Sequence, residues 1–152
     1  MKPAKGVVAI EFLMLFPFVM AMLYASASYG ITFFAKYRMQ DAVDRAVAAA
    51  LYVDRSNPTI EIDGDPISVE EAAVGRARLV LNTLTGAFSW PGEREGNCEW
   101  DDDSGIKLVH CTLTYKEYSQ AGNAIVPALN FGMLGSFPPL PDNLTAEARA
   151  AF

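Results

Sequence analysis

The chain has 152 residues, about the length of one domain, and apolar residues make up 51% of it and charged residues 20%. This composition excludes a disordered tail. Its 18 acidic and 12 basic residues give a net charge of −6, which argues against nucleic-acid binding because contacts to phosphates need clustered Lys and Arg. One histidine and two cysteines are too few for the usual zinc sites.

The apolar residues are concentrated near the amino terminus. From Phe12 to Ala35, 24 consecutive residues include no Asp, Glu, Lys or Arg. About 20 apolar residues cross the roughly 30 Å of hydrocarbon in a bilayer, so this run predicts a membrane-spanning helix. A buried core helix is the alternative, and it is disfavoured because so small a domain has little protein to surround such a run. The run is also longer than the apolar region of a cleaved secretory signal.

The helix is expected to continue beyond the membrane and to stop before Asn57-Pro58. Apolar residues recur three and four positions apart between Met39 and Ala50, which is the spacing of an amphipathic helix. Asp41 and Arg45 are placed to form an ion pair one turn apart. The sequence therefore predicts a helix over residues 7–53, with the membrane span at about 12–35 and an amphipathic extension at 36–53.

Two residues near or within the predicted span need a physical explanation. Glu11 places a carboxylate at the edge of the apolar run, where a charge is costly unless it lies among the headgroups or meets a cation. Pro17 removes a backbone hydrogen bond and usually kinks a helix, and both a tolerated membrane proline and a functional kink fit its position. Small residues that would let a partner helix approach closely also recur at Ala21, Ala25, Ser28 and Thr32.

The segment around Glu11 resembles a known processing signal. Lys5-Gly6, four apolar residues, Glu11 and a long apolar helix resemble the class III signal of type IV prepilins and pseudopilins. The continuation through Phe12, Pro17 and a Tyr29-Gly30 pair is similar to the TadE/TadF-type pseudopilins of the tight-adherence (Tad/Flp) system, and so is the Ala-rich extension of the helix. The resemblance covers residues up to about 53 well and the remainder only loosely.

This resemblance implies that a membrane-embedded prepilin peptidase cuts after Gly6, so that residues 1–6 are a leader and Val7 becomes the amino terminus. Glu11 is then the fifth residue of the mature chain, and the α-ammonium of a neighbour's Val7 is its expected partner in a bundle of helices. The implied function is that of a minor pseudopilin in assembly of the Flp/Tad pilus, without enzymatic activity. Its implied partners are other pilins or pseudopilins, the inner-membrane assembly platform and the lipid bilayer. The alternative is a signal-anchored periplasmic binding module that does not enter a pilus.

Residues 54–152 are expected to form a head outside the membrane, with 15 acidic and 7 basic residues and a net charge of −8. Thr59–Ile62 predicts a short strand before a turn. Ser68 and Glu71 form a capping box that opens a helix, and Gly86 is expected to end it. The apolar face expected for this helix comprises Val69, Ala73, Ala77, Val80 and Leu84.

Ser104-Gly105 predicts a two-residue hairpin loop between strands from about Asn97 to about Tyr118. Counting outward from the loop places Cys98 opposite Cys111 at a non-hydrogen-bonded pair, with Cα atoms about 4.5 Å apart, at the short end of disulfide geometry. We predict a disulfide, and two free buried cysteines are the alternative. A disulfide needs an oxidising compartment, whereas the basic residues flanking the span are nearly balanced. The expected location is therefore the bacterial inner membrane, crossed once, with the head in the periplasm.

The remaining sequence of the head predicts strands and one short helix. Apolar and polar residues alternate over Val109–Tyr115 and again over Asn143–Phe152, which is typical of half-buried strands. Ala124–Leu134 is expected to form a short helix broken by Pro127 and Gly132. The predicted fold is α+β: a long amino-terminal transmembrane and amphipathic helix that carries a small head with an antiparallel sheet and one or two helices.

Few residues of the head carry chemistry. His110 has no recognisable nucleophile or second base to work with, so a plain strand residue is favoured over a catalyst. Asp101-Asp102-Asp103 offers carboxylates for calcium but lacks the EF-hand spacing, so an acidic solvated turn is favoured. The sequence predicts no catalytic residues, no metal site and no cofactor.

Overall fold

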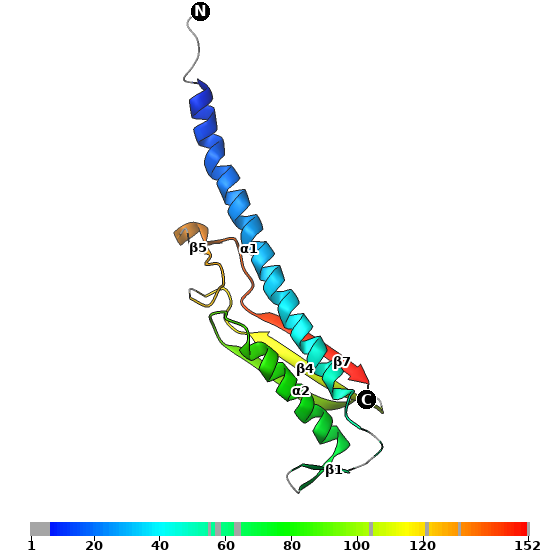
Figure 1. The fold of residues 1–152 in the computed structure, drawn as a ribbon. Helices are drawn as coiled ribbons and strands as arrows, with labels where there is room; N and C mark the ends of the chain where they lie inside the picture. The colour runs from blue at the N-terminus through cyan, green and yellow to red at the C-terminus, as the bar shows by residue number, and fades with distance from the viewer. Residues whose placement is uncertain are drawn as a thin grey trace, which may run out of the picture.

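The computed structural model of the chain describes residues 7–54, 56, 59–62, 65–103, 105–120, 122–130 and 132–151. Helix α1 (Val7–Ala50) leads into a head that contains helix α2 (Val69–Gly86) and a set of β-strands (Figure 1). The strands are β1 (Thr59–Ile62), β2 (Asp65–Ser68), β3 (Arg94–Asp103), β4 (Ile106–Tyr115), β5 (Leu129–Asn130), β6 (Ser136–Phe137) and β7 (Leu144–Ala151), and a 3₁₀ turn, η1, occupies Gly132–Leu134. The predicted α+β fold, with a long amino-terminal helix and a small antiparallel head, is confirmed.

Helix α1 ends three residues before the expected residue 53. Leu51, Tyr52 and Val53 follow it with hydrogen bonds of 3.1–3.3 Å from each N–H to the carbonyl three residues earlier. Such bonds tighten the last turn of a helix and satisfy carbonyls that lack a partner four residues on. The expected stop at Asn57-Pro58 lies outside the described residues.

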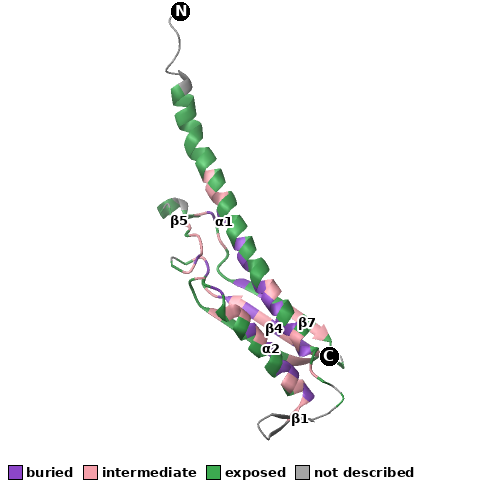
Figure 2. Cartoon of the chain, in the orientation of Figure 1, coloured by how far each residue is buried: buried purple, intermediate pink, exposed green. Residues whose placement is uncertain are grey.

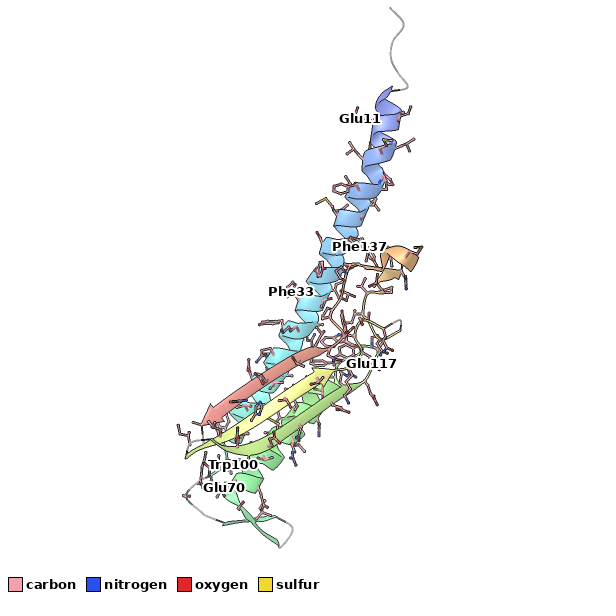
Figure 3. The ribbon with its side chains drawn as sticks, turned by 180° about the vertical axis from the view of Figure 1, so that it is seen from behind. Glu11, Phe33, Glu70, Trp100, Glu117 and Phe137 are labelled. Carbon is pink, nitrogen blue, oxygen red and sulfur yellow. A yellow bond between two sulfur atoms is a disulfide. The ribbon has the colours of Figure 1, made fainter. Side chains whose placement is uncertain are left out.

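The head is a two-layer structure. Strands β3, β4 and β7 form an antiparallel sheet in the order β3-β4-β7, and α1 and α2 lie side by side on one face of it, as the opposite views of Figures 1 and 3 show. The face of β4 toward the helices is apolar and buried, as the alternation predicts, and consists of Val109, Cys111, Leu113 and Tyr115. Helix α1 contributes the buried residues Ala35, Met39, Ala42, Val43, Ala46, Val47 and Ala50.

Helix α2 begins and ends where the sequence predicts. The Ser68 hydroxyl accepts the N–H of Glu71 at 3.2 Å, and the Glu71 carboxylate accepts the N–H of Ser68 at 3.3 Å, which completes the capping box. The buried face differs from the prediction, because Leu81 is fully buried whereas Val80 and Leu84 are only partly buried. The buried stripe keeps a spacing of four residues, the ridge that commonly packs against a neighbouring helix.

The β3–β4 hairpin has the predicted register. Cys98 lies opposite Cys111, and the two form a disulfide with an S–S distance of 2.01 Å and Cα atoms 4.0 Å apart, so the disulfide prediction is confirmed. Gly105 has a φ of 79°, the left-handed conformation that a two-residue hairpin loop requires, and the loop residue before it lies outside the described residues. The strands begin at Arg94 and end at Tyr115, three residues earlier at both ends than expected.

The expected helix at Ala124–Leu134 is wrong. Turns lead instead into β5, which pairs with β6 around the 3₁₀ turn η1. Gly132 and Gly135 have φ values of 63° and 84°, and residues in this left-handed region end a right-handed helix. Pro127 lacks the N–H that a helix would need at that position.

Candidate functional site: the exposed stem

The amino-terminal part of α1, up to Met20, is exposed, and Figure 2 draws it in green. Each described side chain from Ala9 to Met20 is exposed, and the large apolar ones have exposed fractions between 49% and 77%. Among the described residues, one helix is long and apolar enough to cross a membrane, and it lies within Ala9–Ala50. A helix that is apolar all round and uncovered by its own chain is suited to lipid or to a bundle of similar helices. We call α1 the stem.

The predicted processing and pairing residues lie at the free end of the stem. Val7 is the first residue of α1, and Gly6 with the rest of the predicted leader lies outside the described residues. Glu11 lies about one turn into the helix and is exposed among apolar neighbours (Figure 3). No described residue forms an ion pair with Glu11. Four residues of helix separate Val7 from Glu11, which is about 6 Å along the axis.

Helix α1 continues through Pro17. Because proline has no N–H, the carbonyl of Leu13, four residues earlier, lacks its usual helical donor. This carbonyl lies in the exposed apolar half of the stem, where water is scarce if lipid surrounds it. A kink at Pro17 remains a prediction.

The small-residue stripe of the stem is used in part by the protein's own head. Ser28 and Thr32 are 1% and 8% exposed. The Thr32 hydroxyl donates to the carbonyl of Ser28 at 2.9 Å and lies 3.1 Å from the hydroxyl of Tyr118, which is fully buried. The lower part of the stripe therefore contacts the head, and Ala21 and Ala25 are partly buried as well. No local pattern in the sequence indicates this contact, because 86 residues separate Thr32 from Tyr118.

The candidate chemical groups of the head do not assemble into a site. Among the described residues, no group of three or more His, Cys, Asp and Glu is close enough to hold a metal ion. Asp101 and Asp102 lie on β3, where successive side chains point to opposite faces, so they do not converge. His110 lies on β4 with its Nε2 atom 3.6 Å from the carboxylate of Glu147.

A groove of about 840 Å³ separates α2 from the β3–β4 hairpin. Lys107 donates to the Glu70 carboxylate at 2.8 Å across its rim and lies 6.0 Å from the ring centre of Trp100. The hydrogen bond from Lys107 lowers the pKa of Glu70 below its ordinary value, and the same bond raises the pKa of Lys107. The exposed pair links α2 to the hairpin along the edge of the groove.

Comparison with known proteins identifies the stem. The model of the TadE-like protein family matches residues 6–48, which is nearly all of α1 and the residue before it. No curated protein and no solved structure matches the chain. The matched segment contains the predicted cleavage site, Glu11, Pro17 and the exposed apolar half of the stem. The resemblance stated from the sequence is confirmed over residues 6–48, where the chain is similar to the TadE-like family of the Tad system.

Proposed function

We propose that the protein is a minor pseudopilin, processed by prepilin peptidase after Gly6 and used in assembly of the Tad/Flp pilus. The observation that carries this proposal is that the TadE-like match, residues 6–48, coincides with a helix whose amino-terminal part, Ala9–Met20, is apolar and exposed. Such a helix is surrounded by lipid before assembly and by the stems of other pilins or pseudopilins afterwards. The head at residues 54–152 is too large for the short major Flp pilin, which favours a minor subunit.

Cleavage after Gly6 is consistent with the local structure. Because α1 begins at Val7, the processed chain would carry its α-ammonium on the first residue of a helix. A positive charge is unfavourable at a helix amino terminus, where the backbone N–H groups already give a partial positive charge. A nearby carboxylate offsets this effect, and Glu11 lies one turn away.

The pairing of Glu11 sets the relative position of neighbouring stems. Removing one partner of a buried ion pair costs about 3–5 kcal/mol, so a carboxylate inside a bundle of stems needs its cation. For the α-ammonium of a neighbour's Val7 to meet Glu11, two parallel stems must be offset by four residues, about 6 Å along the axis. Without this offset, the ammonium and the carboxylate of one stem would have no oppositely charged partner on the neighbouring stem. We infer that this charge pair selects the register of assembly.

The disulfide supports the orientation of the chain in the membrane. Cys98 and Cys111 are both fully buried in the core of the head, and disulfides persist in oxidising compartments such as the periplasm. The proposal therefore has the stem crossing the inner membrane once, with Val7 at the cytoplasmic side and the head in the periplasm. The assembly platform of the inner membrane and the prepilin peptidase would both act on the stem.

Replacement of Glu11 tests the pairing. Glu11→Ala and the isosteric Glu11→Gln are both expected to insert into the membrane normally and to be absent from pilus-assembly complexes recovered by crosslinking. Glu99→Gln, which neutralises an exposed carboxylate of the head, is the matched control and is expected to be incorporated like the unaltered chain. Normal incorporation of Glu11→Gln would refute the charge-pairing mechanism.

A further inference from the structure

The head contains a second uncharged segment as long as the predicted membrane span. Residues 118–141 include no Asp, Glu, Lys, Arg or His over 24 positions. All 15 acidic and 7 basic residues of the head lie outside this segment, in residues 54–117 and 142–152. We call residues 118–141 the apolar lobe; its described parts are 118–120, 122–130 and 132–141.

The apolar lobe is a closed loop with fixed ends. At its base, the Tyr118 N–H donates to the carbonyl of Asp142 at 2.6 Å, and the Ser119 hydroxyl donates to the Asp142 carboxylate at 2.6 Å. Just outside these residues, the N–H of Glu117 donates to the side-chain oxygen of Asn143 at 3.1 Å. A loop whose ends are joined in this way is a folded element of the head.

The lobe packs against the middle of the stem. The hydroxyl of Tyr24 donates to the carbonyl of Pro127, and the hydroxyl of Tyr29 donates to the carbonyl of Pro139 at 3.2 Å. Figures 1 and 3 show β5, η1 and β6 on the amino-terminal side of the sheet, beside α1. These contacts fix the height of the lobe on the stem at residues 24–29.

The outer end of the lobe presents apolar side chains to its surroundings. Leu129, on β5, is 46% exposed, and Met133, in η1, is fully exposed. Both residues lie in a segment without a charged side chain, so the outer end of the lobe offers apolar side chains and no charge to its surroundings.

The height of the lobe coincides with the expected edge of the bilayer. The head buries Ser28, Thr32 and Ala35, so the part of the stem that lipid can surround ends earlier than the predicted span of 12–35. A span that begins at Val7 crosses the roughly 30 Å of hydrocarbon with about 20 residues and ends near Ser26. The headgroup layer then begins between Tyr24 and Tyr29, and tyrosines are enriched at this depth. A charged side chain is costly next to the hydrocarbon, and the lobe has none.

We propose that the apolar lobe is a second membrane contact, which places Leu129 and Met133 in the interfacial layer of the periplasmic leaflet. This inference rests on the proposed function in one respect, the single crossing of the membrane by the stem. The lobe would fix the height and rotation of the stem, because it is joined to the stem through Tyr24 and Tyr29 and reaches the lipid on one side only.

Depth-dependent fluorescence quenching tests the lobe contact. The full chain, with its disulfide intact, receives a single new thiol as Met133→Cys, Phe16→Cys or Ile106→Cys, and each is labelled with an environment-sensitive fluorophore. Phe16 is exposed on the stem, and Ile106 is 57% exposed at the turn of the β3–β4 hairpin. In single-copy nanodiscs with nitroxide lipids, labels at 133 and 16 are expected to be quenched at least twofold and the label at 106 to be unaffected.

The three labels separate the possible failures. Quenching at 16 without quenching at 133 would overturn the lobe contact and leave the membrane-spanning stem intact. Absence of quenching at both positions would refute the membrane anchor and the proposed function with it. If the label at 133 is shielded from aqueous iodide only in nanodiscs that hold two copies, the lobe binds another copy and the membrane contact is wrong. A second comparison uses a fluorophore at Leu129→Cys in nanodiscs. Adding Met133→Asp is expected to reduce the quenching of this label, and an unchanged near-UV circular dichroism spectrum is the control for correct folding.

Discussion

Loss of the Cys98–Cys111 disulfide is expected to destabilise the head by about 3 kcal/mol. The bond joins residues 13 positions apart, and closing a loop of this length in the unfolded chain removes roughly 10 cal/mol/K of entropy, which corresponds to about 3 kcal/mol at room temperature. Both cysteines are fully buried, so the native structure cannot relax around them to offset the lost stability when the bond is absent. With an m-value of about 1.5 kcal/mol/M, the urea midpoint should fall by about 2 M.

Tryptophan fluorescence provides the assay for this change. Trp90 stacks on Phe88 with ring centres 4.5 Å apart and lies 6.4 Å from Tyr115, so unfolding of the head changes its surroundings. The full chain in detergent is compared in its oxidised state, after reduction in urea and refolding, and as the double variant Cys98→Ala/Cys111→Ala. Equal midpoints for the oxidised and reduced chains would refute the reasoning, as would two free thiols in protein isolated without reductant.

Three further substitutions in the head have expected outcomes. Gly96→Val should destabilise the head by about 1–3 kcal/mol in urea unfolding, because a Cβ at Gly96 would lie 3.0 Å from a methyl of Leu81. Gly75→Ala should stabilise α2 by about 0.5–1 kcal/mol, because a Cβ at Gly75 would meet no atom within 4 Å. Equal effects of the two substitutions would contradict this reasoning. Lys107→Gln should raise the pKa of Glu70 toward its ordinary value, because the hydrogen bond from Lys107 lowers it. Because the folded-state pKa is lowered, Glu70 stabilises the head at pH values above its ordinary pKa, and this stabilisation is lost as the pH falls through the folded-state pKa. The variant should therefore lose less stability on acidification. An unchanged NMR titration of Glu70 in the variant would contradict the assignment.

The features predicted correctly from the sequence are those that local rules determine. A two-residue loop sets the register of a hairpin by counting, and this placed Cys98 opposite Cys111. The capping box at Ser68 is recognisable because both of its hydrogen bonds join residues three apart. Strand β2 was missed because Pro66 lies in it, and proline is rare inside paired strands.

The features that the sequence did not predict depend on contacts between distant segments. The apolar residues around Pro127 suggested a short helix, yet their partners lie on the stem, about 100 residues earlier in the chain. The burial of Ser28 and Thr32 has the same origin, since Tyr118 covers a face that the sequence alone assigns to a partner helix. The 24-residue uncharged run at 118–141 is visible in the sequence, but it can be interpreted as a membrane contact only once its position along the stem is known.

The amino terminus of the protein isolated from a host with an active prepilin peptidase is the most direct test of the account. Amino-terminal sequencing and intact mass measurement are expected to show a chain that begins at Val7, and the Gly6→Glu variant, in which cleavage is blocked, should be six residues longer. A chain that retains residues 1–6 in that host would contradict the account and would indicate a signal-anchored periplasmic module.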